Sequence, residues 1–442
     1  MAIQLSEHFT TRKLLYFTLP SIVMMIFTSV YSVVDGFFVS NFVGKTAFAA
    51  VNFIMPYLLI LGALGFMFGT GGSALIAKSM GEGQAEKANA QFSLFVYVAL
   101  IGGVLVTVLG FLGLRPIAAL LGAEGAMLED CVRYGRIILI ALPAYMLQYA
   151  FQAFFVAAEK PQLGLGVTVV AGLTNIVLDA LLVAVIPLGL VGAALATALS
   201  QAVGGLLPLL YFAMPNTSCL RLGKTRWNGR WLGQVCLNGS SELMSNISMP
   251  LVGMLYNMQL MRVAGEDGVA AYGVIMYVNM IFLALFIGYS VGSAPLVSYH
   301  YGAENHEEMR NLRRKSLMII GCFAVLMFVA AELLAVPLAT LFVGYDAALC
   351  DMTVHGFRVF SISFLFAGFA VYGSGFFTAL NNGPLSALIS FLRTLVFETA
   401  AIIILPFLFG IDGIWISVVV AEFMATVIAF ALMYWKRKVY QY

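Results

Sequence analysis

Long apolar runs, separated by short polar breaks, cover almost the whole chain. A helix needs about 20 apolar residues to cross a membrane, whereas a transmembrane barrel strand has about 10 residues of alternating polarity. The runs are continuous, so the pattern predicts an all-α integral membrane protein. Twelve transmembrane helices are expected, at residues 14–40, 47–77, 91–113, 132–158, 161–186, 188–214, 231–261, 269–300, 315–342, 354–380, 384–409 and 411–435.

Composition supports this interpretation and excludes several classes of protein. The 442 residues are 62% hydrophobic and 10% charged, whereas a soluble domain is about half apolar and about a quarter charged. A net charge of +2 is too small to attract nucleic acid by long-range electrostatics. The five cysteines form no CxxC pair, so no zinc or redox motif is indicated. Without a nucleophile–base or metal constellation, we expect neither an enzyme nor a resident cofactor.

The sequence repeats at half its length. A shift of 221 residues places 51–86 on 272–307 without a gap. This offset predicts two pseudo-symmetric six-helix lobes, residues 1–214 and 231–442, joined by a basic cytoplasmic linker at 215–230. Parallel repeats that rock about a central cleft are typical of transporters. The shift also pairs Gly71 with Gly292, Gly81 with Gly302, Gly135 with Gly356, Gly189 with Gly410 and Gly192 with Gly413.

The distribution of Lys and Arg predicts the orientation. With the N-terminus inside, sixteen of these residues lie on the cytoplasmic side and six on the other. Cytoplasmic loops carry the excess of positive charge, so both termini are expected in the cytoplasm and the chain in the plasma membrane. One chain contains a complete cleft, which favours a monomer whose partners are the lipid bilayer and small molecules.

Seven ionisable residues lie inside apolar runs, where each carboxylate costs roughly 2.5–3.5 kcal/mol on insertion scales. Six are acids and one is a base, a balance that favours a cavity attracting cations. Glu332 is expected near the lipid interface. The seven are Asp35, Asp179, Glu242, Glu332, Arg393, Glu398 and Glu422.

The first lobe contains the clearest candidate site. Asn175 and Asp179 are four residues apart and share one face of the fifth span. Thr197 in the sixth span adds a hydroxyl oxygen, and Asp35 lies fifteen residues after Pro20 in the first span. Pro20 removes a backbone hydrogen bond and bends the helix, and oxygen ligands suit hard cations. A protonation or Na⁺ site is therefore predicted; the alternative is that both acids are hydrogen-bonded within packed helix contacts.

The second lobe gives weaker indications. Glu242 and Glu398 are candidates for a second protonatable group, while Arg393 can pair with Glu398 or with Glu422 in a structural role. Methionine side chains re-pack easily and suit a promiscuous binding surface, although a Met stripe is more often core or lipid contact. The candidates for a substrate cavity are Met24, Met249 and Met276.

Taken together, these residues resemble the MATE (multidrug and toxic compound extrusion) family over the whole chain. The resemblance rests on two six-span halves, Leu19-Pro20 before Asp35-Gly36, Asn175-xxx-Asp179, Thr197, and Gly239-Ser240-Ser241-Glu242 at the start of the seventh span. It implies efflux of organic, often cationic, compounds in exchange for H⁺ or Na⁺ by alternating access of two lobes.

The resemblance also implies roles for particular residues. Asp35, Asn175, Asp179 and Thr197 would form the first-lobe cation site, and Pro20 would be the point where the first helix bends. Some branches of the family use an acid in the tenth span, but this span contains Tyr372 and no Asp or Glu. The alternative is a lipid-linked sugar flippase of the same superfamily, which would need basic residues in the cleft.

Overall fold

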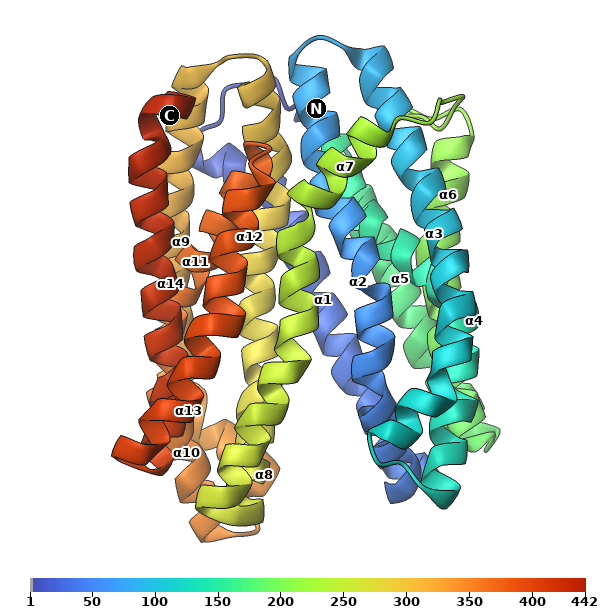
Figure 1. Ribbon diagram of the computed structural model, residues 1–442, viewed down its shortest axis with the longest axis vertical. Coiled ribbons are helices and arrows are strands. Elements are labelled where there is room, and N and C mark those ends of the chain that lie inside the picture. Colours follow the sequence, from blue (N-terminus) through green and yellow to red (C-terminus); the bar gives the residue numbers. More distant parts are fainter. Residues whose placement is uncertain (1–2) are drawn as a thin grey trace.

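The computed structural model describes residues 3–442, which fold into two side-by-side helical bundles without a strand (Figure 1). The prediction of an all-α membrane protein is confirmed. Both termini lie at the same end of the molecule, here called the termini end (Figure 1). The first bundle consists of α1 (Thr11–Phe38), α2 (Lys45–Gly81), α3 (Ala85–Leu120), α4 (Gly125–Ala157), α5 (Pro161–Asp179) and α6 (Gly189–Ala213).

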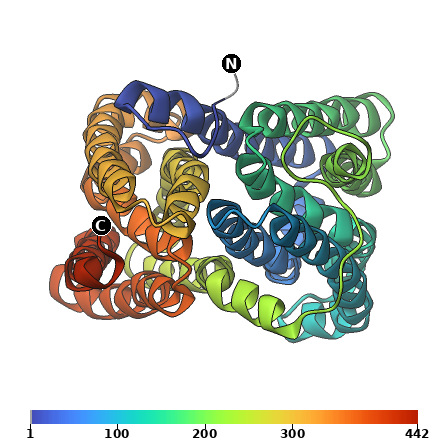
Figure 2. The ribbon, with the colours of Figure 1, turned by 90° about the horizontal axis from the view of Figure 1, so that it is seen from above.

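The second bundle follows α7 (Gly229–Asn238), a short helix at the edge of the molecule between the bundles (Figure 2). Three π-helical segments occur in the described spans: η1 (Val39–Val43) ends the span that begins with α1, η2 (Ala180–Val185) ends the span that begins with α5, and η3 (Leu392–Phe397) lies within a span. The second bundle contains α8 (Ser240–Gly302), α9 (His306–Val343), α10 (Ala347–Ser361), α11 (Phe364–Ala379), α12 (Gly383–Phe391), α13 (Glu398–Phe409) and α14 (Ile411–Tyr440).

All twelve predicted spans have counterparts within residues 3–442. Ten helical stretches are long and apolar enough to cross a membrane. One of them, α8, is two helices merged across Gly265, whose φ of 66° and ψ of −152° are not helical. A further span is broken into α10 and α11, which meet at an angle of 47°. The break is absent from the hydropathy pattern because both pieces are apolar.

The predicted boundaries differ most at the seventh and ninth spans. The predicted span 231–261 joins α7 to the start of α8, whereas the chain leaves helical geometry at Gly239, with φ −91° and ψ 1°. A Cβ at Gly239 would lie 2.0 Å from the carbonyl oxygen of Met67, so the backbones of α2 and this turn are in contact. Helix α9 begins at His306 rather than 315, because the Asn305 side chain caps it by accepting from the Glu308 N–H (3.1 Å).

The bundles meet through glycines toward the termini end, and the ribbons of α2 and α8 diverge toward the other end (Figure 1). A Cβ at Gly81 would lie 1.9 Å from the carbonyl oxygen of Tyr299, and a Cβ at Gly302 would lie 2.1 Å from that of Lys78. The 221-residue shift relates Gly81 to Gly302 and Lys78 to Tyr299. The two contacts are therefore equivalents about one pseudo-two-fold axis.

Another repeated pair forms matching turns. Gly189 and Gly410 both have φ near +60° (60° and 59°), a conformation that other residues rarely adopt, and each begins or immediately precedes a helix, α6 and α14 respectively. The sequence repeat thus marks the places where the backbone needs glycine, either for close approach or for a left-handed turn.

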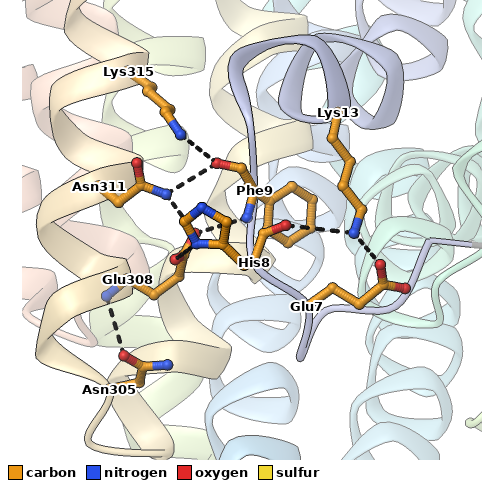
Figure 3. A network of polar contacts seen from close by, with 8 residues as sticks. All are labelled: Glu7, His8, Phe9, Lys13, Asn305, Glu308, Asn311 and Lys315. Carbon is orange, nitrogen blue, oxygen red and sulfur yellow. Dashed lines mark hydrogen bonds and ion pairs between the residues drawn. The ribbon is translucent and has the colours of Figure 1, made fainter.

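Residues 3–10 connect the two bundles at the termini end. The Leu5 N–H donates to Glu159 Oε1 (2.7 Å) in the turn between α4 and α5. On the other side, Phe9 N–H donates to Glu308 Oε1 (3.0 Å) in α9, and Lys315 donates to the Phe9 carbonyl (2.6 Å; Figure 3). Leu5 and Phe9 are fully buried, so this N-terminal segment is a packed part of the fold.

Candidate functional site

The predicted first-lobe residues converge where α1, α5 and α6 pack together. Asp35 lies near the end of α1, Asp179 is the last residue of α5, and Thr197 lies in the first half of α6. Gly172 permits this approach, since a Cβ there would lie 2.4 Å from the ring of Phe27 in α1. The spacing seen in the sequence therefore places three elements around one polar cluster, here called the acidic site: Asp35, Asn175, Asp179 and Thr197.

The two carboxyl groups of the acidic site are close enough to interact directly. Asp35 also interacts with Asn175, and Thr197 Oγ1 donates a hydrogen bond to Asp35 Oδ1 (3.3 Å). Asp179 is completely buried, whereas Asp35 is half-buried. One acid is thus enclosed and the other borders accessible space.

The acidic site has an excess of acceptor atoms. Within the part of the chain that the structure describes, neither carboxyl oxygen of Asp179 has a hydrogen-bond donor, and neither does Oδ1 of Asn175. Two carboxyl groups can hydrogen-bond to each other only when one of them holds a proton, and an unpaired buried carboxylate is costly. The arrangement fits a bound proton, or a small hard cation held by oxygen atoms.

Two tyrosines border the acidic site and were missed by sequence analysis. Tyr134 in α4 interacts with Thr197 and with both acids, and Tyr31 in α1 interacts with Asp35. Tyr31 lies four residues before Asp35, a spacing that puts both on one helix face and that could have identified it. Tyr134 had no such signal, because only the tertiary packing of α4 brings it to the site.

Each π-helical segment adjoins an intramembrane charge. Segment η1 follows Asp35 by four residues, η2 directly follows Asp179, and η3 contains Arg393 and ends next to Glu398. π-Helical turns inside α-helices occur frequently at functional sites, because they widen the helix and re-aim side chains. Apolar periodicity cannot reveal them, since inserting one residue leaves the hydrophobic run unbroken.

Pro20 does not lie within the acidic site. Fifteen residues of helix separate it from Asp35, which corresponds to about 22 Å at 1.5 Å per residue. It is buried and lines a cavity of about 740 Å³ with residues of the α4–α5 turn, among them Glu159 and Lys160. Its predicted role in bending α1 stays a prediction.

The second-lobe acids surround one arginine. Arg393 binds Glu422 through two nitrogens, with Nε–Oε2 at 2.9 Å and Nη2–Oε1 at 2.7 Å. Glu242 and Glu398 also interact with Arg393, and Glu398 interacts with the hydroxyl of Tyr256, whose ring stacks on Tyr272 at 5.1 Å. Of the two pairings left open by the sequence, the structure contains Arg393 with Glu422. Glu398 therefore has no ion pair in the described residues.

The other predicted residues lie apart from these clusters. Tyr372 is buried beside Tyr289 and Ser316, away from Glu242 and Glu398. Met24 is also buried, whereas Met249 is 58% exposed; Met276 is half-buried, with its sulfur 3.9 Å from the Asn279 amide. Glu332 accepts a hydrogen bond from Ser361 (2.6 Å).

Within the described residues, no group of three or more His, Cys, Asp or Glu side chains could hold a metal ion. Alkali-metal coordination is different, because it uses hydroxyl, amide and carbonyl oxygens as well as carboxylates. The oxygen-rich acidic site has that chemistry.

Comparison with known proteins gives a consistent result. The family model MatE matches twice, at residues 20–181 and 243–404. The multidrug export protein MepA of Staphylococcus aureus (strain MRSA252) is 25% identical over 428 residues, covering 96% of this chain and 93% of MepA. MepA of Staphylococcus saprophyticus is 25% identical over 425 residues, with the same coverage of both chains.

Solved structures share the fold over nearly the full length. An outward-facing multidrug resistance MATE family transporter of the MOP superfamily has a TM-score of 0.93 at 22% identity, covering 99% of this chain and 98% of that one. A MATE protein in the bent conformation has a TM-score of 0.89 at 21% identity, covering 98% of this chain and 96% of that one. One family match lies in each half of the sequence repeat, and together the two matches cover most of the chain. The chain belongs to the MatE family.

Proposed function

We propose that this protein is an antiporter that exports organic, often cationic and amphipathic, compounds in exchange for inward H⁺ or Na⁺. The observation that carries the proposal is the acidic site, in which the Asp179 carboxyl group, which interacts with Asp35, and the Asn175 amide oxygen lack hydrogen-bond donors among the described residues. A site of this kind is stable only when it holds a proton or a cation. The export activity of its MepA relatives supports the substrate class.

In the proposed cycle, the ion neutralises Asp35 and Asp179 while the far side of the membrane is accessible. Neutral carboxyl groups tolerate a closed, dry environment that ionised groups resist. Bending of α1 at Pro20 would then couple ion binding to the separation of the lobes and to substrate release. One positive charge that moves inward at 100 mV provides about 2.3 kcal/mol, which is enough to drive exchange of one H⁺ for a neutral compound.

The proposal includes an orientation and a working unit. The termini end carries the basic linker, so we place it in the cytoplasm and the chain in the plasma membrane. The lobes are in contact toward this end, and the structure therefore corresponds to a state closed to the cytoplasm. Both lobes belong to one chain, so the unit proposed for transport is a monomer. The MATE neighbours are described as transporters, and we propose transport in place of any enzymatic activity.

Dye efflux from proteoliposomes, with the Na⁺ gradient and the pH gradient imposed separately, tests the function. Asp35→Asn should abolish coupled efflux because an amide cannot accept the coupling ion's charge. Glu332→Gln is the matched control, since Glu332 is an intramembrane acid outside the acidic site. Normal coupled efflux by Asp35→Asn would refute the site. Transport of lipid-linked sugars without dye efflux would indicate the flippase alternative.

A further inference from the structure

A second polar cavity, here called the basic pocket, lies at the termini end between α2, α3 and α7. It has a volume of about 250 Å³. That volume is below the roughly 300–1,000 Å³ of drug-sized sites and suits a small polar group. It is distinct from the acidic site, and its residues come from the ends of helices. The lining includes Lys78, Glu82, Lys87, Gln91, Arg230 and Trp231.

The pocket has more positive charge than its own acid can neutralise. Glu82 is shared by Lys87 (3.2 Å) and Lys78 (3.8 Å). Arg230 forms no ion pair with any described residue, although its guanidinium is the group best suited to bidentate binding of phosphate. Three cations and one carboxylate therefore line a cavity of small-anion size.

Buried polar groups complete the wall of the pocket. Ser79 and Gln91 are 3% and 1% exposed, and Ser79 Oγ donates to Gln91 Oε1 (2.8 Å). This bond orients the amide and leaves its two N–H donors without an acceptor among the described residues. A fixed amide donor beside flexible Lys and Arg side chains favours the binding of an oxyanion.

The position of the pocket suits a group at the membrane surface. The linker lies along α3, where Arg221 N–H donates to Asn89 Oδ1 (2.7 Å) and Gly223 N–H to Ser93 Oγ (3.0 Å). It therefore places Arg221, Lys224 and Arg226 along the first turns of α3, at the same end of the molecule as the basic pocket, with Trp227 77% exposed. Basic residues next to a membrane span attract anionic lipids, and exposed Trp is typical of the interface.

The basic pocket is also connected to the contact between the lobes. The Lys78 ammonium lies over the ring of Tyr301 in α8, 5.2 Å from its centroid. The carbonyl oxygen of the same lysine faces Gly302 across the interface. An anion that binds Lys78, Lys87 and Arg230 would hold α2, α3 and α7 together beside the point where the lobes touch.

We propose that the basic pocket binds a phosphate group and that its occupancy stabilises the state closed at the termini end. The phosphate is supplied either by the headgroup of an anionic phospholipid or by a soluble phosphate anion. The proposal does not depend on the coupling ion or on the exported compound, so it stands or falls separately from the proposed function.

The test uses the purified full chain in detergent, with the apparent Tm as the readout. Three additions are compared at matched ionic strength: phosphatidylglycerol, phosphatidylcholine and inorganic phosphate. The wild type should gain stability from phosphatidylglycerol or from phosphate, and more than it gains from phosphatidylcholine. Lys87→Gln/Arg230→Gln should lose at least half of that gain. Arg12→Gln/Arg314→Gln, which removes two exposed cations outside the pocket, should keep it.

The outcomes separate the two sources and can overturn the proposal. A gain from phosphatidylglycerol alone identifies a lipid headgroup, and a pocket-dependent gain from inorganic phosphate identifies a soluble anion. Equal gains in the pocket variant and the control variant would refute the site. If the pocket variant does not fold, Trp231 fluorescence in the wild type, corrected by Trp231→Phe, replaces it: a saturable change with either anion supports the site, and no change refutes it.

Discussion

Gly81 of α2 lies directly against the carbonyl oxygen of Tyr299 in α8, so closely that a Cβ at Gly81 would be 1.9 Å from that oxygen. Its repeat partner, Gly302, makes the equivalent contact with Lys78. Two backbone-to-backbone contacts thus close the termini end, and neither partner is a flexible side chain that could move aside.

Gly81→Ala should separate the lobes at the termini end and shift the protein away from the closed state. We expect efflux to fall at least tenfold, which corresponds to about 1.4 kcal/mol of lost stabilisation of that state. Gly102→Ala is the matched control, because a Cβ at this helical glycine meets nothing within 4 Å. Spin-label distances across α2 and α8 provide the measurement; unchanged distances in Gly81→Ala would contradict the prediction.

A substitution at Thr197 should show whether H⁺ or Na⁺ is the coupling ion. Its hydroxyl donates to Asp35, and it also offers an oxygen to a cation in the acidic site. Thr197→Val keeps the shape but removes both functions. If Na⁺ is the coupling ion, the Na⁺ concentration for half-maximal efflux should rise about tenfold, since one ligand is lost. If H⁺ is the ion, the pH profile should move while Na⁺ has no effect. Thr197→Ser should restore the wild-type response in either case.

Removing one partner of the buried Arg393–Glu422 pair should lower the stability of the protein more than removing both partners. Glu422→Gln leaves the Arg393 side chain, which is 15% exposed, without its bidentate partner, and breaking such a pair costs about 3–5 kcal/mol. Replacing both residues, as Arg393→Met/Glu422→Met, should restore part of that loss, because the pair itself leaves no unpaired charge while Glu242 and Glu398 lose their interaction with Arg393. Thermal unfolding in detergent measures both; a double variant no more stable than Glu422→Gln would argue against this account.

Much of the architecture could be predicted from the sequence because hydropathy and the 221-residue offset are global signals. The spacing of Asn175 and Asp179 predicted a shared helix face, and Asp35 and Thr197 do lie beside it. Tyr134 could not be found in this way, since helix periodicity says nothing about which helices pack together. The break at Gly265 was predicted, because the polar stretch 262–268 separates two apolar runs. The break between α10 and α11 was hidden, because apolar residues continue on both sides of it.

The contacts of the N-terminal segment, residues 3–10, could not be predicted from the sequence either. Glu308 lies in a polar stretch of sequence that gives no sign of its partners. In the structure it is buried and accepts from His8 Nδ1 (2.5 Å), Phe9 N–H (3.0 Å) and Asn311 Nδ2 (2.7 Å) (Figure 3). Sequence patterns indicate which residues of a single helix are buried, whereas this network joins segments about 300 residues apart.

Glu308→Ala should release the N-terminal segment, because the three groups that donate to the Glu308 carboxylate lose their acceptor. Amide hydrogen exchange of residues 4–9 should then accelerate at least tenfold, while exchange in the helices far from the segment stays unchanged. Glu307→Ala is the control at the neighbouring exposed position. Equal protection of residues 4–9 in the two variants would show that the apolar contacts of Leu5 and Phe9 hold the segment without Glu308.

Docking of the N-terminal segment should also depend on pH through Glu159. Burial raises the pKa of this carboxyl group above its usual value, although the hydrogen bond from Leu5 N–H opposes the shift. When the segment undocks, Glu159 is exposed to water and its pKa returns toward the usual value. The docked state therefore binds more protons, so docking is strongest at low pH and weakens as pH rises through the raised pKa.

Hydrogen exchange of residues 4–9, corrected for its intrinsic pH dependence, should show more protection at pH 5 than at pH 8. In Glu159→Gln this difference should shrink, because a neutral amide has no charge to bury at high pH. If protection instead increases with pH in the wild type and Glu159→Gln removes the increase, the ionised carboxylate is the form that holds the segment.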